Sequence, residues 1–185
     1  MVLKLYGHPL STCTRRVATV LHEKQVSFEI IPVDFAKGGH KSTAYLEKQP
    51  FGQVSYIDDG FILFESRAIS LYIASKYANQ GTPSSQPNSK PTLSSNKLVP
   101  WSYATSVLRK EQWRRMKGLK SDKARFDEYI PALSAKLDGY ERILSKQKYL
   151  AGDEITLADL YHLPYAEVLP KAGSNVMLEK PNVAR

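Results

Sequence analysis

A segment rich in proline, serine and asparagine divides this 185-residue chain into two parts with different patterns. Residues 79–100 contain four prolines and few apolar side chains that a core could bury. Such a composition is typical of a flexible linker. The sequence therefore predicts two domains, at residues 1–80 and 101–185, joined by a linker at 81–100.

The first part alternates strand and helix patterns. We expect strands at 2–6, 27–33, 53–57 and 61–64, and helices at 14–24, 42–48 and 65–77. A strand–helix–strand order favours a parallel pair with a right-handed crossover. The Asp58-Asp59-Gly60 run indicates a hairpin between the last two strands. This order matches a thioredoxin-like α/β domain.

The second part has helical patterns throughout, so we expect an all-α domain. Helices are predicted at 101–117 and 121–146, with Pro131 kinking or dividing the second one. An apolar stripe supports the later half of that helix, at Leu133, Leu137, Tyr140 and Leu144. Thr156 and Asp159 have the spacing of a capping box, which marks a helix start and has a structural role.

The net charge of +8 raises the question of an anionic partner. Much of the charge lies between Lys97 and Arg125, without zinc-finger spacing, a ribonucleoprotein motif or aromatic-basic alternation. We interpret it as a solvated helix face, then as attraction for a small anion, and only third as a nucleic-acid site. We expect neither nucleic acid nor a membrane as a partner.

Cellular location is indicated by what the sequence lacks. The single cysteine, Cys13, cannot form an intrachain disulfide, which fits a reducing compartment. No apolar run approaches the roughly 18 residues of a membrane-spanning helix. The first residues, interrupted by Lys4, do not resemble a signal peptide. We expect a cytoplasmic protein.

The loop GHPLSTCTRR, residues 7–16, is the first candidate for chemistry. Ser11 stands just before the predicted helix, whose free N–H groups and positive dipole end suit an anion. A serine hydroxyl there can donate a hydrogen bond to a thiolate. The ordinary interpretation of such a serine is an N-cap, and the loop alone leaves both roles open.

Five motifs occur in register along the chain: GHPLSTCTRRV at 7–17, GGHK at 38–41, PFGQV at 50–54, FESRAI at 64–69, and YLAGD at 149–153, leading to Asp159. Together they resemble the soluble glutathione transferases, most closely the phi class of plants and fungi. The resemblance covers residues 2–83 and resumes from about Leu119 to Arg185. It implies a glutathione transferase-like fold, glutathione as co-substrate, no metal, and a homodimer.

The resemblance assigns Ser11 as the residue that activates the glutathione thiol. It implies that the thiolate then attacks a small hydrophobic electrophile, with peroxide reduction as a further reaction. Binding positions follow by the same match: Glu65 and Ser66 for the γ-glutamyl group, His40 and Lys41 for the glycine carboxylate, Gln53 as a hydrogen-bonding residue, and the Val54 backbone for the cysteinyl unit. We expect Cys13 to be a bystander thiol and His8 to support the loop.

Ser55 is the clearest departure from the family, because relatives have a cis-proline at this position. A cis bond costs about 0.5–1 kcal/mol before proline and about 2.5–4 kcal/mol before serine. Either the Val54–Ser55 bond is cis, supported by its surroundings, or it is trans and the Val54 backbone is misdirected. We expect a weakened glutathione site.

Two further departures concern the C-terminal domain. The match to the family is lost between Pro83 and Gly118, where we expect the chain to be shortened, and relatives continue beyond Arg185. True divergence and a defective gene model or splice form both account for these differences. They leave an alternative function open: a catalytically weak or inactive ligand-binding or protein-interaction module of the same fold.

Overall fold

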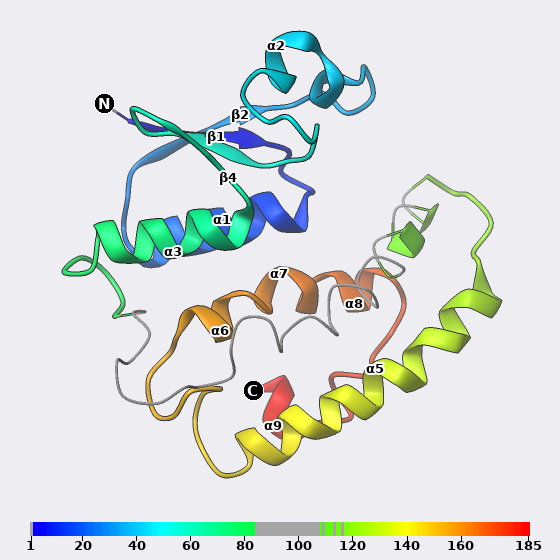
Figure 1. Cartoon of the computed structure of the whole chain (residues 1–185). Helices are drawn as coiled ribbons and strands as arrows, with labels where there is room; N and C mark the ends of the chain where they lie inside the picture. The colour runs from blue at the N-terminus through cyan, green and yellow to red at the C-terminus, as the bar shows by residue number, and fades with distance from the viewer. Residues whose placement is uncertain (1, 84–107, 109, 113, 116) are drawn as a thin grey trace. The chain divides into compact units, whose positions relative to one another are not determined.

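A computed structural model describes residues 2–83, 108, 110–112, 114, 115 and 117–185 (Figure 1). The chain forms two compact units, Met1–Gln86 and Pro87–Arg185. Most of the predicted 81–100 linker and much of the 101–117 helix lie outside the described residues, so the proposed domain limits stay a prediction. Within the described part, no helix is long and apolar enough to cross a bilayer.

The first unit is built on a mixed four-stranded sheet. Its strands are β1 (Leu3–Gly7), β2 (Phe28–Pro32), β3 (Tyr56–Asp58) and β4 (Ile62–Phe64), in the order β2-β1-β3-β4. β1 is parallel to β2 and antiparallel to β3, and β4 is antiparallel to β3. The predicted parallel pair, the hairpin and the thioredoxin-like fold are therefore confirmed.

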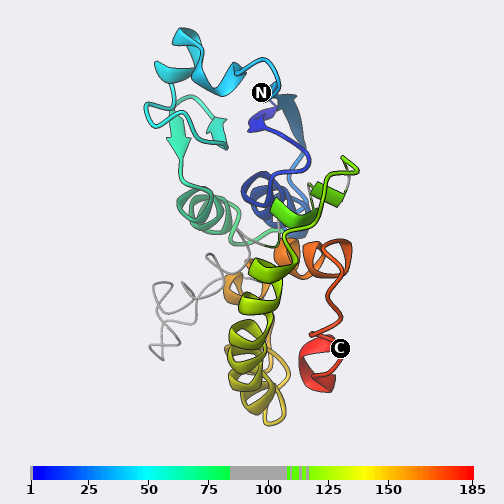
Figure 2. The same ribbon diagram turned by 90° about the vertical axis from the view of Figure 1, so that its right-hand side faces the viewer.

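The helices of this unit are α1 (Thr12–Glu23), η1 (Gly39–Lys41), α2 (Thr43–Leu46) and α3 (Ser66–Lys76). Figures 1 and 2 both show α1 and α3 side by side on one face of the sheet, while α2 lies toward the opposite side. The core between sheet and helices is apolar because spaced residues of each element face inward, including Leu5, Val17, Val20, Ile57, Ile69 and Ile73, all 0% exposed. This packing holds the amino ends of α1 and α3 next to each other.

The described elements of the second unit are helical apart from an isolated bridge between Tyr149 and Gly152. They are residues 108, 110–112, 114 and 115, α5 (Lys123–Leu144), α6 (Leu157–Leu160), α7 (Leu163–Ala166), α8 (Val168–Lys171) and α9 (Pro181–Ala184). The predicted capping box of Thr156 and Asp159 is present at α6. The expected all-α domain is confirmed for this part of the chain.

Pro131 does not divide the long helix, because α5 runs through it. The buried Leu133 and Leu137 anchor the following turns in an apolar cluster with residues of α8, against which Tyr140 also packs. Tertiary packing of the stripe thus offsets the backbone hydrogen bond that proline cannot make.

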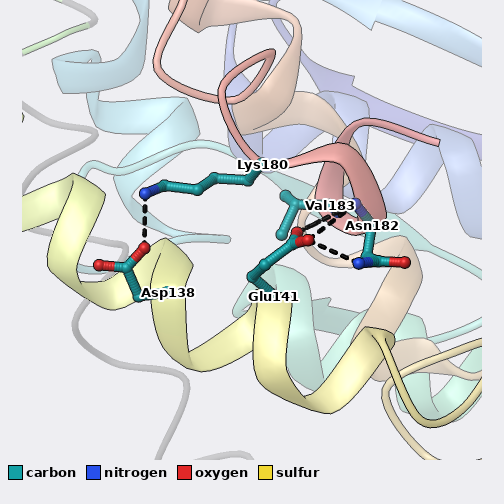
Figure 3. Close-up of polar contacts among 5 residues, drawn as sticks. All are labelled: Asp138, Glu141, Lys180, Asn182 and Val183. Carbon is teal, nitrogen blue, oxygen red and sulfur yellow. Dashed lines mark hydrogen bonds and ion pairs between the residues drawn. The ribbon is translucent and has the colours of Figure 1, made fainter.

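The segment that includes α9 is fastened to α5 by a carboxylate, as Figure 3 shows. Both oxygens of Glu141 accept hydrogen bonds from the Asn182 backbone N–H, at 3.0 and 3.2 Å. Glu141 also accepts from Asn182 Nδ2 at 2.6 Å and from the Val183 N–H at 3.1 Å. Beside it, Lys180 Nζ lies 2.5 Å from Asp138 Oδ1. Glu141 therefore satisfies backbone donors that α9 itself cannot pair.

We expect this attachment to be lost in acid. Partial burial acts to raise the pKa of Glu141, but hydrogen bonds from Asn182 and Val183 outweigh it and lower the pKa. A carboxyl whose pKa is lowered in the folded state stabilises the fold at pH values above its ordinary pKa of 4.5. This contribution is lost as the pH falls from there through the lowered pKa of the folded state.

Glu141→Gln should therefore flatten the dependence of stability on pH in this window. Thermal unfolding between neutral and acid pH would measure it, with the exposed Glu179→Gln as control. If the thermal stability of the wild type and of Glu141→Gln falls equally steeply with decreasing pH, the stabilising role of Glu141 would be contradicted.

Candidate active site

The sheet register brings four candidate segments to one end of the first unit. Tyr6, next to the end of β1, is paired with Tyr56 at the start of β3, and Tyr56 is paired with Phe64 at the end of β4. Gly7 is paired with Pro32 at the end of β2. The loops that carry residues 8–11, 33–41, 53–55 and 65–66 therefore all leave the sheet at the same end.

Ser11 is buried, with 7% of its surface exposed, and it caps α1. Its Oγ accepts a hydrogen bond from the Thr14 N–H at 3.4 Å, so the predicted N-cap role is confirmed. A hydroxyl that accepts one hydrogen bond still has its own proton to donate. His8 contributes to the same loop, since its Nδ1 accepts from the Leu10 N–H at 3.2 Å. The cap and the predicted chemical role of Ser11 are thus compatible.

The second helix amino end belongs to α3. Glu65 precedes it with a positive φ of 69° and is exposed, whereas Ser66 is buried at 6% exposure. Ser66 Oγ accepts a hydrogen bond of 2.6 Å from Arg16 Nη1, and Arg16 is only 4% exposed. Arg16 thus connects the first turns of α1 and α3, and it brings a buried positive charge to this end of the sheet.

The role of Arg16 was not predicted from the sequence, although the spacing of Arg16 on α1 held a signal. Arg16 lies four residues before the buried Val20 on the inward face of α1. A cation on an apolar helix face needs a buried partner. The partner of Arg16 is Ser66, 50 residues away along the chain, so the local pattern could not identify it.

His40 and Lys41 lie together in η1. Lys41 is exposed, and its Nζ donates to the Phe51 carbonyl at 3.3 Å. The His40 ring packs against Phe35, with 4.7 Å between ring centroids. Its Nδ1 is buried without a hydrogen-bond partner among the described residues. The other ring nitrogen, Nε2, can donate a hydrogen bond when it carries a proton.

Gln53 and Val54 do not extend β3, contrary to the predicted 53–57 strand. The Gln53 carbonyl accepts from Tyr45 Oη at 2.7 Å, and its N–H donates to Gln49 Oε1 at 3.1 Å. Side chains from α2 and the residues after it have therefore taken the place of a strand ladder. The Val54–Ser55 peptide bond is cis, the first of the two alternatives that the sequence left open.

This end of the sheet has the chemistry of an anion-binding site. It combines the amino ends of α1 and α3 with a buried guanidinium and the donors of η1. Helix amino ends and cations favour carboxylate, phosphate or thiolate groups. Within the described ranges, no three His, Cys, Asp or Glu side chains are grouped so that they could hold a metal ion.

Comparison with known proteins identifies the family. Residues 1–75 match the N-terminal domain model of glutathione S-transferases, and residues 101–185 match the C-terminal domain model. Glutathione S-transferase PM239X14 of Arabidopsis thaliana is 42% identical over 99% of this chain and 88% of that relative. Glutathione S-transferase 3 of Zea mays is 45% identical over 86% of this chain and 75% of its own length.

A solved structure agrees with these matches. Glutathione transferase F7 from Populus trichocarpa has a TM-score of 0.87 at 40% identity, covering 99% of this chain and 90% of that chain. The chain therefore belongs to the glutathione S-transferase family. Its similarity to plant F-type enzymes, including F13 and F9 of Arabidopsis thaliana, confirms the predicted phi class.

Proposed function

We propose that this protein is a glutathione transferase in which Ser11 ionises the glutathione thiol. The observation that carries the proposal is the buried Ser11 hydroxyl at the amino end of α1. It accepts from the Thr14 N–H and keeps its own proton for a ligand. The family members that match are named as transferases, which favours this function over an inactive binding module.

The energetics of thiol activation are within reach of this arrangement. A free thiol with a pKa of about 8.5 is only a few per cent ionised at about pH 7. Lowering the pKa to about 6.5 needs roughly 2.7 kcal/mol of preference for the thiolate. A hydrogen bond to a charged group supplies about 1.5–3 kcal/mol, and a helix amino end adds about 0.3–1 kcal/mol. Ser11 and α1 can therefore ionise the thiol without a histidine base.

The reaction that follows is a nucleophilic substitution or addition. The thiol proton leaves to solvent when the thiolate forms. The sulfur then uses its lone pair to form a bond to an electrophilic carbon. In an aryl halide, the carbon–halogen bond breaks and the halide departs with the bonding electrons.

The remaining groups of glutathione find chemically matched partners at the same end of the sheet. Ser66 Oγ accepts from Arg16, so its hydroxyl proton can turn toward the γ-glutamyl carboxylate, and exposed Glu65 can meet the ammonium. His40 Nε2 and Lys41 suit the glycine carboxylate. The Gln53 side chain can offer hydrogen bonds, and the Val54 backbone would pair with the cysteinyl unit in the manner of an added strand.

The electrophile, the oligomeric state and the location complete the proposal. Relatives are known from crystals with bound conjugates, among them "glutathione S-transferase I from mais in complex with atrazine glutathione conjugate". We expect small hydrophobic electrophiles, a homodimer and a cytoplasmic location. Light scattering during size exclusion would test the dimer, and a monomer at micromolar concentration would contradict it.

Activity itself is tested with the purified full chain. It should be retained on immobilised glutathione and should conjugate a generic aryl halide. Folded protein that shows neither property would overturn the proposed function.

Gly52 offers a test of the Lys41 assignment. Its φ is +57°, and a Cβ there would lie 2.5 Å from Lys41 Nζ and 3.0 Å from the His40 carbonyl oxygen. Gly52→Ala should cost about 1–2 kcal/mol for the left-handed backbone. It should also weaken glutathione binding about five-fold, by displacing the Lys41 charge.

Gly60→Ala is the matched control, because Gly60 has a φ of +81° and nothing within 4 Å of an added Cβ. Chemical denaturation and calorimetric titration would compare the two variants. Equal glutathione affinity in the two variants would contradict the assignment of Lys41 as a binding residue.

A further inference from the structure

Gln53, the residue before Val54, has both of its backbone groups held by buried side chains. Tyr45 Oη donates to its carbonyl at 2.7 Å, and Gln49 Oε1 accepts from its N–H at 3.1 Å. Tyr45 is 7% exposed and Gln49 is 1% exposed, so neither offers its polar atoms freely to solvent. Two buried side chains thus fix the backbone that leads directly to the proposed cysteinyl-binding residue.

Tyr45 is in turn held by an aromatic cluster on the sheet. Its ring meets Tyr56 edge-on at 5.2 Å between centroids, and Tyr56 stacks on Tyr6 at 4.4 Å. Burial, and then the neighbouring Tyr56, raise the pKa of Tyr45, so the phenol keeps its proton and remains a donor. The hydrogen bond to Gln53 therefore starts from a rigid, protonated group.

Tyr45 belongs to α2, and this helix is also connected to the residues proposed to bind the glycine carboxylate. Ser42 Oγ accepts from the Tyr45 N–H at 3.4 Å and donates to the Gly39 carbonyl at 2.9 Å, at the start of η1. Lys41 Nζ reaches the Phe51 carbonyl at 3.3 Å. Hydrogen bonds thus connect several residues between Gly39 and Gln53 to one another.

We propose that Tyr45 and Gln49 are positioning residues that hold the Val54 backbone at a fixed spacing from His40 and Lys41. The inference rests on the proposed function, since these are the groups assigned to the cysteinyl and glycine parts of glutathione. A fixed spacing favours a ligand that reaches both places. Tyr45 and Gln49 therefore contribute to selectivity for the full tripeptide over γ-glutamylcysteine, which lacks the glycine carboxylate.

Tyr45→Phe tests this inference because it keeps the buried ring and removes the hydroxyl. KM and Kd for glutathione should rise about five- to ten-fold, while kcat at saturating glutathione stays within about two-fold. The preference for glutathione over γ-glutamylcysteine should narrow. The pH profile of kcat should not move, because Ser11 still ionises the thiol.

Tyr6→Phe is the matched control, since it removes a hydroxyl from the same aromatic cluster without touching Gln53. Its KM and selectivity should equal those of the wild type. Gln49→Met is the second variant: it removes the acceptor of the Gln53 N–H and keeps an unbranched side chain, so it should reproduce the KM effect if Tyr45→Phe does not fold.

Each outcome decides the matter. A wild type that does not bind glutathione overturns the proposed function and this inference with it. A wild type that binds, with KM and selectivity unchanged in both Tyr45→Phe and Gln49→Met, overturns the inference alone. A fall in thermal stability and apparent kcat at constant KM assigns these residues a structural role and also overturns it.

Discussion

Replacing Ser11 with alanine is expected to lower kcat/KM for conjugation by roughly 10- to 150-fold. This range corresponds to about 1.5–3 kcal/mol for a hydrogen bond to a charged group. The pKa of the bound thiol should return toward the free value of about 8.5. Glutathione affinity at high pH, where the thiol ionises without help, should change much less. Steady-state kinetics across pH would separate these effects.

The Ser11 variant also removes a helix cap, so its control must remove one too. Asp122 caps α5 with the same residue spacing, its side chain accepting from the Arg125 N–H at 3.4 Å. Both alanine variants should lose about 0.5–2 kcal/mol of stability. Conjugation should fall in Ser11→Ala alone, and a similar fall in Asp122→Ala would attribute the loss to folding.

Asp159→Ala should give the largest loss of stability, on the order of 2–4 kcal/mol. One carboxylate accepts from the Leu150 N–H, the Thr156 N–H and Thr156 Oγ1, each at 2.8 Å. Alanine would leave these donors unpaired beside a helix whose Leu157 and Leu160 are buried. The thermal midpoint should fall by on the order of 10 °C.

Asp153→Ala is the comparison for this variant, since Asp153 is an exposed acid in the same connection. It should unfold like the wild type. At low temperature, folded Asp159→Ala should still bind glutathione, because the proposed binding groups belong to the first unit. Loss of binding in protein that is fully folded would contradict a purely structural role for Asp159.

Most of the fold could be predicted from patterns that are local in the sequence. The period of apolar residues placed the strands and helices, and the spacing of Thr156 and Asp159 marked the start of α6. These signals succeed because neighbours along the chain determine them. Pro131 was predicted to kink or divide the helix, and the division was wrong, because packing of Leu133 and Leu137 supports α5 through the proline.

What escaped prediction depends on partners far apart in sequence. Arg16 and Ser66 are 50 residues apart, and no local pattern pairs them. The strand predicted at 53–57 begins late because Tyr45 and Gln49 take the backbone groups of Gln53. The site residues themselves came from the family resemblance, and their roles stay predictions.

Titration of glutathione bound to the folded protein tests the central claim most directly. The thiolate absorbs in the ultraviolet, so a pH series at saturating glutathione reports the pKa of the bound thiol. We predict an inflection at about pH 6.5 for the wild type and one at about pH 8.5 for Ser11→Ala. The same thiol pKa for free glutathione, glutathione bound to the wild type and glutathione bound to Ser11→Ala would contradict the proposed role of Ser11.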